Sequence, residues 1–397
     1  MTGSAGHVHM TLRLPDRTGA ARMALAFGSA LRGAGFDLTL VHGSVPADGR
    51  SILPDFAAIG AATVLESRLD RPWGPLLVPD LAARVRRDAG RVVIGVNQRD
   101  RMPALLAASR AGVPGVLVVG NQHHFWGPRP VAALKRRSYW SVVAARTSLA
   151  VCTSTVVRDE MTAAGVPADR AVVLPNGIAV PPPVQLAGPE RARLRAEMGA
   201  RDGDLLLVNV GRLDLQKGQD LLLEALARPP HPPPVHVALV GTTDSAGAAR
   251  RTAEFAASLH RTVRDRGLDG AVSFLGWRED VGRLLAAADA YVHAARWEGP
   301  ALPLAVMEAM AAGCPAVFPD CSGRPPWFEP GRHGLMARSG DPASLRRRID
   351  ELVAMSGPQR SALGGEGARL IREHYTLEEC GRAFVALIRD VVDRAGS

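Results

Sequence analysis

The chain has 397 residues, of which 47% are hydrophobic and 22% are charged, and its formal net charge is +9. These values favour a two-domain globular protein and exclude a disordered or fibrous chain. The basic charge favours phosphorylated small molecules or an anionic surface, whereas nucleic acid is the weakest partner class, because no zinc finger, RNP motif or basic zipper is present.

The first half of the chain alternates short apolar runs with helical patterns, including an amphipathic helix over about 20–32. Apolar strands that do not alternate with polar positions, and that are separated by helices, indicate a parallel sheet covered on both faces. The expected strands are 8–14, 37–41, 62–65, 92–96, 116–119, 149–152 and 171–175.

The second half repeats this organisation after a proline-containing stretch, 181–203, which we expect to be a linker. The proline cluster 229–234 predicts a stiff loop, and a final amphipathic helix is expected over 377–393. The expected strands are 205–210, 235–240, 272–275, 290–293 and 316–318.

The sequence therefore predicts an α/β protein with two doubly wound, Rossmann-like domains that face a cleft. Their expected limits are 1–180 and 204–375, and the helix within 376–397 is expected to pack back toward the N-terminal domain. Parallel sheets of this kind bind ligands at the carboxyl ends of their strands.

The four cysteines lie far apart without a CxxC spacing, so we expect free thiols, with Cys152 and Cys314 buried in apolar surroundings. No basic segment followed by an apolar run begins the chain, and no apolar stretch approaches the roughly 18 residues of a membrane helix. We expect a cytoplasmic protein that is open to peripheral membrane contact through its basic charge. The sequence does not set its oligomeric state.

Only two of the 48 basic residues are lysines, and one of them, Lys217, lies in the stretch Gly-Arg-Leu-Asp-Leu-Gln-Lys-Gly that begins at Gly211. An expected strand precedes this stretch, and an expected helix follows it. Arg212 and Lys217 are therefore well placed to bind an anion, Arg212 through a bidentate fork and Lys217 as a mobile charge. Taken alone, the pattern also fits a solvated turn.

A second stretch, 289–315, passes from an expected strand through a Gly/Pro loop into a helix that has Pro303 near its start. The loop amides and the helix start offer another anion site. Glu308, on that helix, is suited to accept hydrogen bonds from sugar hydroxyls, although an exposed position that stabilises the helix dipole is the alternative. The Asp-Gly-Asp sequence at 202–204 is more typical of a polar turn than of a metal site.

These two stretches and the continuation 320–341 resemble the retaining nucleotide-sugar glycosyltransferases of the GT-B fold, glycosyltransferase family 4, and the resemblance covers nearly the whole chain. It implies transfer of a sugar from a nucleoside diphosphate to an acceptor hydroxyl, with retention of anomeric configuration and without a metal or cofactor. A UDP-sugar is expected in preference to a GDP-sugar. The acceptor is expected to be a small natural product or a lipid or cell-envelope precursor.

The resemblance assigns roles to individual residues. Arg212 and Lys217 would bind the donor diphosphate, and Glu308 would bind the donor ribose. Glu298 would face the transferred sugar, and His123 would lie near it. The remaining donor-binding positions that it implies are Gly19, Gly211, Gly241, Gly276, Trp277, Arg278, Ala301 and Leu302.

The chain departs from the family pattern between its two glutamates. Nine residues lie between Glu298 and Glu308, whereas seven is usual, so the direction of Glu298 is open. A dinucleotide oxidoreductase is disfavoured because no Gly-x-Gly-x-x-Gly follows the first strand. A sugar-nucleotide epimerase of GT-B fold and a non-catalytic sugar-nucleotide-binding module remain as alternatives.

Overall fold

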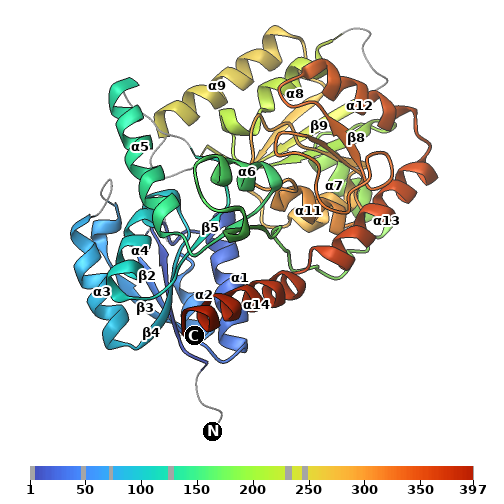
Figure 1. Cartoon of the computed structure of the whole chain (residues 1–397). Coiled ribbons are helices and arrows are strands. Elements are labelled where there is room, and N and C mark those ends of the chain that lie inside the picture. Colours follow the sequence, from blue (N-terminus) through green and yellow to red (C-terminus); the bar gives the residue numbers. More distant parts are fainter. Residues whose placement is uncertain are drawn as a thin grey trace. The chain divides into compact units, whose positions relative to one another are not determined.

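The computed structural model describes residues 5–45, 51–70, 75–123, 129–228, 235–243 and 249–396 (Figure 1). The chain forms two compact units. One consists of Met1–Gly177 together with Leu377–Ser397, and the other of Ile178–Thr376. Each unit is a parallel sheet with helices packed on its faces. The expected stiff loop at 229–234 lies outside the described residues.

The first unit contains a seven-stranded parallel sheet in the order β3-β2-β1-β4-β5-β6-β7. Its strands are β1 (His7–Leu12), β2 (Asp37–His42), β3 (Ala62–Leu65), β4 (Gly90–Gly95), β5 (Gly115–Val119), β6 (Leu149–Cys152) and β7 (Ala171–Val173). Its α-helices are α1 (Gly19–Gly33), α2 (Leu53–Ala58), α3 (Val78–Arg87), α4 (Gln98–Ala111), α5 (Arg129–Arg146), α6 (Thr155–Ala163) and α14 (Leu377–Gly396). All of β5 and β6 is buried, as expected of strands covered on both faces.

The last helix, α14, completes the first unit by packing against α1. The rings of Phe27 and Phe384 stack with their centroids 4.0 Å apart. The helices approach closely at Gly381, where a Cβ atom would lie 2.8 Å from the side chain of Ala30. The expected return of the C-terminal helix to the N-terminal half is confirmed.

The second unit contains a six-stranded parallel sheet in the order β10-β9-β8-β11-β12-β13. Its strands are β8 (Leu205–Val210), β9 (Val235–Val240), β10 (Val272–Gly276), β11 (Ala290–Val292), β12 (Ala316–Pro319) and β13 (Leu335–Ala337). Its α-helices are α7 (Gly188–Glu197), α8 (Gln219–Leu226), α9 (Ala249–Asp265), α10 (Val281–Ala287), α11 (Leu304–Ala311), α12 (Pro342–Ala354) and α13 (Gly357–His374). Alternate residues of β8 enter two different cores, one on each face of the sheet.

The structure corrects two expectations. The stretch 181–203 is not a linker, because it contains α7, whose Leu194 is buried in the core of the second unit together with Met198. The edge strand β13 was not expected, since three residues give too short a pattern to recognise. Residues 202 and 203 form a turn, and all four cysteines are free thiols. Within the described residues, no helix is long and apolar enough to cross a membrane.

Candidate active site

The candidate site lies at the carboxyl ends of β8 and β11 in the second unit. These two strands are neighbours, and successive strands are added outward from them in opposite directions. Such a switch point leaves a crevice between the loops that follow the two strands, where open α/β sheets bind ligands. Lys217 and Arg212 come from the loop after β8, and His293 and Glu298 from the loop after β11.

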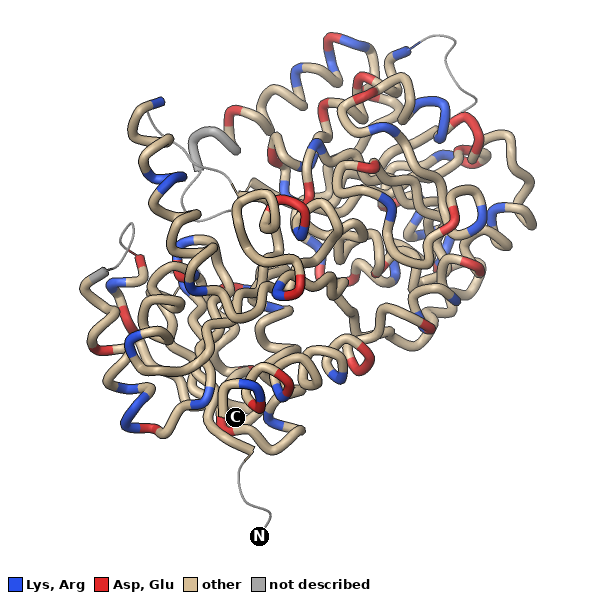
Figure 2. The backbone as a smooth tube through the Cα atoms, in the orientation of Figure 1, with Lys and Arg blue, Asp and Glu red and all other residues tan. Residues whose placement is uncertain are grey.

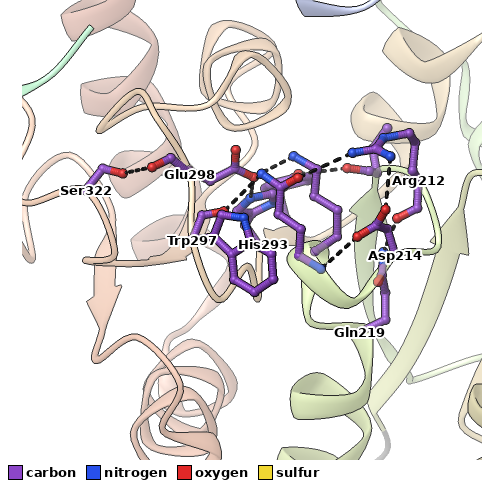
Figure 3. Close-up of polar contacts among 11 residues, drawn as sticks. Arg212, Asp214, Gln219, His293, Trp297, Glu298 and Ser322 are labelled. Atoms are coloured by element: carbon purple, nitrogen blue, oxygen red, sulfur yellow. Dashed lines mark hydrogen bonds and ion pairs between the residues drawn. The ribbon is translucent and has the colours of Figure 1, made fainter. Parts of the chain in front are cut away.

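The ion pair between Lys217 and Glu298 joins these two loops. Lys217 Nζ lies 2.5 Å from Glu298 Oε1, and His293 Nε2 lies 3.1 Å from the same oxygen (Figure 3). Glu298 is almost fully buried, with 6% of its side chain exposed, whereas Lys217 keeps 20%. The hydroxyl of Ser322 donates to the backbone carbonyl of Glu298. Glu298 therefore points into the site, which resolves the direction that its unusual spacing left open.

The electrostatics of this pair follow from burial and contact. Burial alone would raise the pKa of Glu298, but the charge of Lys217 and the hydrogen bond from His293 outweigh it and lower the pKa to about 2. Burial also lowers the pKa of His293, so its ring is neutral near pH 7. Because a carboxylate only accepts, Nε2 of His293 carries the proton. Nδ1 lies 3.2 Å from the Tyr291 hydroxyl, which donates to the Val210 carbonyl at 3.3 Å.

Arg212 is held at the mouth of the site by its own loop. Its guanidinium donates to Asp214 at 3.0 Å and to Gln216 at 3.4 Å, and its side chain is 40% exposed. The Gln219 amide donates to the Arg212 carbonyl at 2.8 Å, and the Gln216 amide donates to the Trp297 carbonyl at 3.2 Å (Figure 3). Arg212 therefore has a fixed direction, yet part of its fork stays open to solvent.

Glycine lets the loop that carries Lys217 approach the loop after β11. Gly218 has φ +65°, and a Cβ atom there would lie 2.1 Å from the Ala294 carbonyl oxygen. The Arg296 amide donates to the Gln216 carbonyl at 2.8 Å, and the Arg296 guanidinium pairs with Asp220. Lys217 and Glu298 are thus positioned by contacts between the backbones of their two loops.

Three of the expected donor-binding glycines lie together at the ends of β8, β9 and β10. Gly241 has φ +143°, and a Cβ atom there would lie 1.9 Å from the Gly211 carbonyl oxygen. The Gly241 amide donates to the Gly276 carbonyl at 2.8 Å, and the Gly211 amide donates to Val240 at 2.9 Å. The backbone at this edge can be approached closely because glycines carry no side chain that would cover it.

The helix α11 begins at the same edge of the sheet. Its N-cap is Pro303, no side chain of the described residues caps its first turn, and that turn contains no acidic residue. An uncapped helix start leaves backbone amides available to an anion. The two expected contact residues just before it, Ala301 and Leu302, have buried side chains, so only their backbone could serve a ligand.

Glu308 lies on α11 near the buried Tyr291. Burial is the main cause that raises the pKa of the Tyr291 hydroxyl, and the charges of Glu308 and then Glu298 raise it further. The loop 299–303, which forms a bend, accommodates the two extra residues between the glutamates. Both carboxylates therefore lie near one tyrosine despite their unusual spacing.

At the end of β10, Trp277 and Arg278 follow Gly276. Trp277 is 60% exposed, which is unusual for so large an aromatic side chain. Arg278 is ion-paired with Asp280 at 2.8 Å and also with Glu197 of α7. Its charge is therefore already compensated, and the backbone of this segment suits a ligand better than the guanidinium does.

The remaining two candidates belong to the first unit. Gly19 is exposed at the start of α1, after the N-cap Thr18, whose side chain does not cap the helix. His123 is buried, with Nδ1 3.0 Å from Glu160 and Nε2 2.9 Å from Arg101 and 2.8 Å from the Tyr139 hydroxyl. Because a guanidinium only donates, Nε2 accepts and Nδ1 donates to Glu160. Both ring nitrogens thus have protein partners, and a role of His123 beside a sugar stays a prediction.

A buried carboxyl lies near this network. Asp100, in the first turn of α4, accepts a hydrogen bond from the Arg13 amide at 2.8 Å, and its other oxygen has no partner among the described residues. Burial raises the pKa of Asp100 to about 8. Sequence reasoning had no sign of this group, since aspartates are almost never fully buried.

Two family models match the chain. The model described as Glycosyltransferase Family 4 matches residues 17–180, and the model described as Glycosyl transferases group 1 matches residues 190–369. The fold is that of a solved structure of Anabaena HepE in complex with UDP-glucose, with a TM-score of 0.78 and 18% identity, over 97% of this chain and 100% of that one. The chain belongs to the GT-B glycosyltransferases.

Among curated glycosyltransferases, the chain is 30% identical to the lipopolysaccharide core biosynthesis glycosyltransferase LpsE of Rhizobium meliloti. The aligned 195 residues cover 49% of this chain and 52% of the relative. It is 31% identical over 202 residues to the putative glycosyltransferase EpsD of Bacillus subtilis, covering 50% and 49% of the two chains. The chain thus spans about half the length of these relatives. A glycosyltransferase structure from Rickettsia africae has the same fold, with a TM-score of 0.80, 13% identity and 99% of each chain covered.

Sequence reasoning missed several residues of this GT-B site: His293, Asp214, Gln216 and Ser322. His293 had a signal, because a polar residue directly after a buried strand lies at the ligand-binding edge of a parallel sheet. The other three act through hydrogen bonds within or between loops, which no spacing in the sequence reveals.

Proposed function

We propose that this chain is a retaining, metal-independent glycosyltransferase that moves a sugar from a nucleoside diphosphate to an acceptor hydroxyl. The observation that carries the proposal is the meeting of Lys217 and Arg212 with a buried carboxylate, Glu298, at the switch point of the second unit. Two cations and an uncapped helix start at that edge suit a diphosphate, and a carboxylate beside them suits sugar hydroxyls.

The departing diphosphate requires charge stabilisation. Lys217, the exposed part of the Arg212 fork and the amides at the start of α11 would supply it. Fixed donors of this kind stabilise charge that develops in a transition state at little cost in reorganisation. Glu298 compensates Lys217 in the structure, so donor binding would transfer Lys217 from a carboxylate to a phosphate and release Glu298 toward the sugar.

Retention fits a same-face substitution, in which the acceptor proton passes to an oxygen of the leaving phosphate. Retaining hydrolases instead use two carboxylates about 5 Å apart across the bond. Here Glu298 is committed to Lys217 and His293 and is strongly acidic, so it suits binding better than nucleophilic attack or proton transfer. Positioning and diphosphate stabilisation would then account for most of the catalysis.

We propose UDP as the donor nucleotide. The solved structures of HepE with UDP and with UDP-glucose are of a protein of the same fold that holds this class of ligand. For the acceptor, we propose a small molecule or a lipid-linked precursor. Curated relatives include D-inositol 3-phosphate glycosyltransferases and a diphosphoundecaprenol galactosyltransferase, and so cover both classes.

The proposal is tested by calorimetric titration of the full chain with UDP-sugars and GDP-sugars in the presence of EDTA, followed by product analysis with and without candidate acceptors. Lys217→Met should lose donor affinity, whereas Arg261→Met, on the exposed surface of α9, should keep it. Release of an altered sugar nucleotide without an acceptor would instead identify an epimerase. Donor binding without hydrolysis or transfer would identify a binding module.

A further inference from the structure

Two histidines lie on the same face of the sheet near the start of β1. Residues two apart in a strand point to the same side, so His7 and His9 are neighbours there. Their rings stack, with centroids 4.7 Å apart and planes at 19°. His9 is completely buried, whereas His7 is partly exposed, and its Nε2 atom lies 2.8 Å from the hydroxyl of Thr39 on β2. Two fixed imidazoles side by side can present nitrogen atoms to one ligand.

A carboxylate completes this group. Asp88, the C-cap of α3, lies in the turn before β4, and its Oδ2 atom is 3.0 Å from Nε2 of His9. One potential ligand atom from each of the three residues lies within 4.8 Å of the other two. Arg87 pairs with the other oxygen, Oδ1, at 3.1 Å, which orients the carboxylate and leaves Oδ2 toward the histidines. We call His7, His9 and Asp88 the β1 cluster.

The turn that carries Asp88 has an unusual backbone. Ala89, the next residue, has φ +48°, a left-handed conformation that is costly for a residue with a side chain. At Gly90, a Cβ atom would lie 2.9 Å from Nδ1 of His9, so glycine is what lets the turn approach the ring this closely. Strain of this kind persists only where the surrounding structure holds it, and here it places the carboxylate beside a buried histidine.

The ring of His9 can release its Nε2 atom to a metal. Because a carboxylate only accepts, Nε2 donates its proton to Asp88 in the structure. Nδ1 is buried and has no hydrogen-bond partner among the described residues, so moving the proton from Nε2 to Nδ1 would break no bond at Nδ1. Burial also lowers the pKa of His9, which keeps the ring neutral near pH 7. The neutral ring is the form that binds metals.

The spacing of the β1 cluster suits a small tetrahedral ion. Zn²⁺ binds imidazole nitrogen and carboxylate oxygen at about 2.0–2.2 Å, which places neighbouring ligand atoms about 3.3 Å apart. The atoms of Asp88 and His9 are already 3.0 Å apart. The ligand atom of His7 would have to approach by at most about 1.5 Å, which a partly exposed side chain can achieve by rotation.

The charges around the β1 cluster favour a metal that bonds to imidazole over one held by charge alone. The last turn of α3 is basic and contains Arg84, Arg86 and Arg87 (Figure 2). The charge of Arg84 acts on His9 and would oppose any cation bound there. Mg²⁺ and Ca²⁺ prefer oxygen ligands and depend on negative charge, whereas Zn²⁺ suits a site with two imidazoles.

We propose that the β1 cluster binds one Zn²⁺ ion through His7, His9 and Asp88, with a water as the fourth ligand. The ion would tie β1 to the turn before β4 and so stabilise the first unit. It would take no part in sugar transfer, because the cluster lies near the amino end of β1, whereas parallel sheets bind their substrates at the carboxyl ends of the strands. This inference goes beyond the proposed function and does not depend on it.

The test is calorimetric titration of the full chain, dialysed against EDTA and then freed of it, with ZnCl₂ and with MgCl₂. We expect one Zn²⁺ site at the cluster and no binding of Mg²⁺. At about a hundredfold excess of free Zn²⁺ over its Kd, binding should raise the Tm of the first unit by about 5–10 °C. With Co²⁺ in place of Zn²⁺, the visible absorption of a four-coordinate ion should appear.

Two double variants carry the same substitutions in different places. His7→Gln with Asp88→Asn removes two ligands but keeps polar groups that can form the same hydrogen bonds. His260→Gln with Asp265→Asn, both exposed on α9, is the matched control. The first variant should bind Zn²⁺ at least about 100-fold more weakly, since losing an outer-shell partner alone costs about 10–100-fold. It should also lose the Tm shift and the Co²⁺ absorption, and the control should keep all three.

Both double variants should keep the wild-type circular dichroism spectrum in EDTA. His7→Gln alone, at a partly exposed position, repeats the comparison if the double variant does not fold. Equal Zn²⁺ affinities in the site variant and the α9 control would overturn the proposal, because the ion would then bind elsewhere. Binding of Mg²⁺ as tight as that of Zn²⁺, or a wild-type Co²⁺ spectrum like that of the free ion, would overturn coordination by the two imidazoles.

Discussion

Removing Lys217 should destabilise the second unit because its partner is buried. In Lys217→Met, Glu298 would keep only the hydrogen bond from His293, while just 6% of its side chain is exposed to solvent. Breaking a buried ion pair by removing one partner costs about 3–5 kcal/mol. Because Lys217 is itself 20% exposed, the lower end applies, about 3 kcal/mol. For a domain of roughly 200 residues this lowers Tm by about 6–12 °C.

A second variant separates charge compensation from chemistry. Combining Lys217→Met with Glu298→Gln leaves a neutral pair of similar shape, and the new side-chain amide oxygen can still accept from the Nε2–H of His293. We expect the double variant to recover most of the lost stability. Its transfer rate should nevertheless stay about 10²–10³-fold low, the usual effect of removing one donor that stabilises developing negative charge.

The measurements are thermal unfolding by calorimetry and kcat with a UDP-sugar that the wild-type chain uses. A wild-type Tm for Lys217→Met would refute the buried ion pair. A double variant as unstable as the single one would show that the stability lost with Lys217 comes from its packing and not from its charge. Full transfer by either variant would remove Lys217 from the diphosphate.

Three further outcomes are expected. The pKa of Asp100 in the folded chain is raised to about 8, so between about pH 4 and pH 8 the folded chain holds a proton that the unfolded chain has released, and stability falls as the pH rises. Asp100→Asn should flatten this fall in denaturant titrations, and an unchanged pH slope would contradict the assignment. Glu308→Ala should weaken nucleotide affinity by about 10–100-fold in calorimetry, the value of a hydrogen bond to a charged group, and equal affinities would remove Glu308 from the ribose. Gly218→Ala should lower Tm more than Gly267→Ala. Both glycines have φ +65°, but only at Gly218 would a Cβ atom lie 2.1 Å from a carbonyl oxygen, that of Ala294. Equal losses of Tm would mean that this close approach does not matter.

The sheets could be predicted from the sequence because fully buried parallel strands leave continuous apolar runs. The strands β3, β6, β8 and β9 begin and end at the residues expected. The strand β13 and the helix α7 were missed for opposite reasons. Three residues are too few to form a pattern, and a helix as polar as α7, with one buried side chain, Leu194, does not stand out beside a proline-rich stretch.

At the site, the cations were predicted and their partners were not. Arg212 and Lys217 stand out because of composition and their position after a strand. The contact between Lys217 and Glu298 joins residues 81 apart in sequence, and it depends on Gly218 lying against the loop after β11. The partners of His123 could not be predicted either. Its ring nitrogens form hydrogen bonds with Arg101 and Glu160, and nothing in the sequence around His123 indicates these residues.

The position of α14 has a consequence for the order in which the protein is made. The ring of Phe384 covers Phe27, so part of the first unit's core is closed by a helix that leaves the ribosome after the whole second unit. The second unit, Ile178–Thr376, is by contrast one continuous segment, and its two ends meet where the Ile178 amide donates to the Tyr375 carbonyl at 2.9 Å. Domains fold as units during synthesis. The later half of the chain can therefore finish folding before α14 packs against α1.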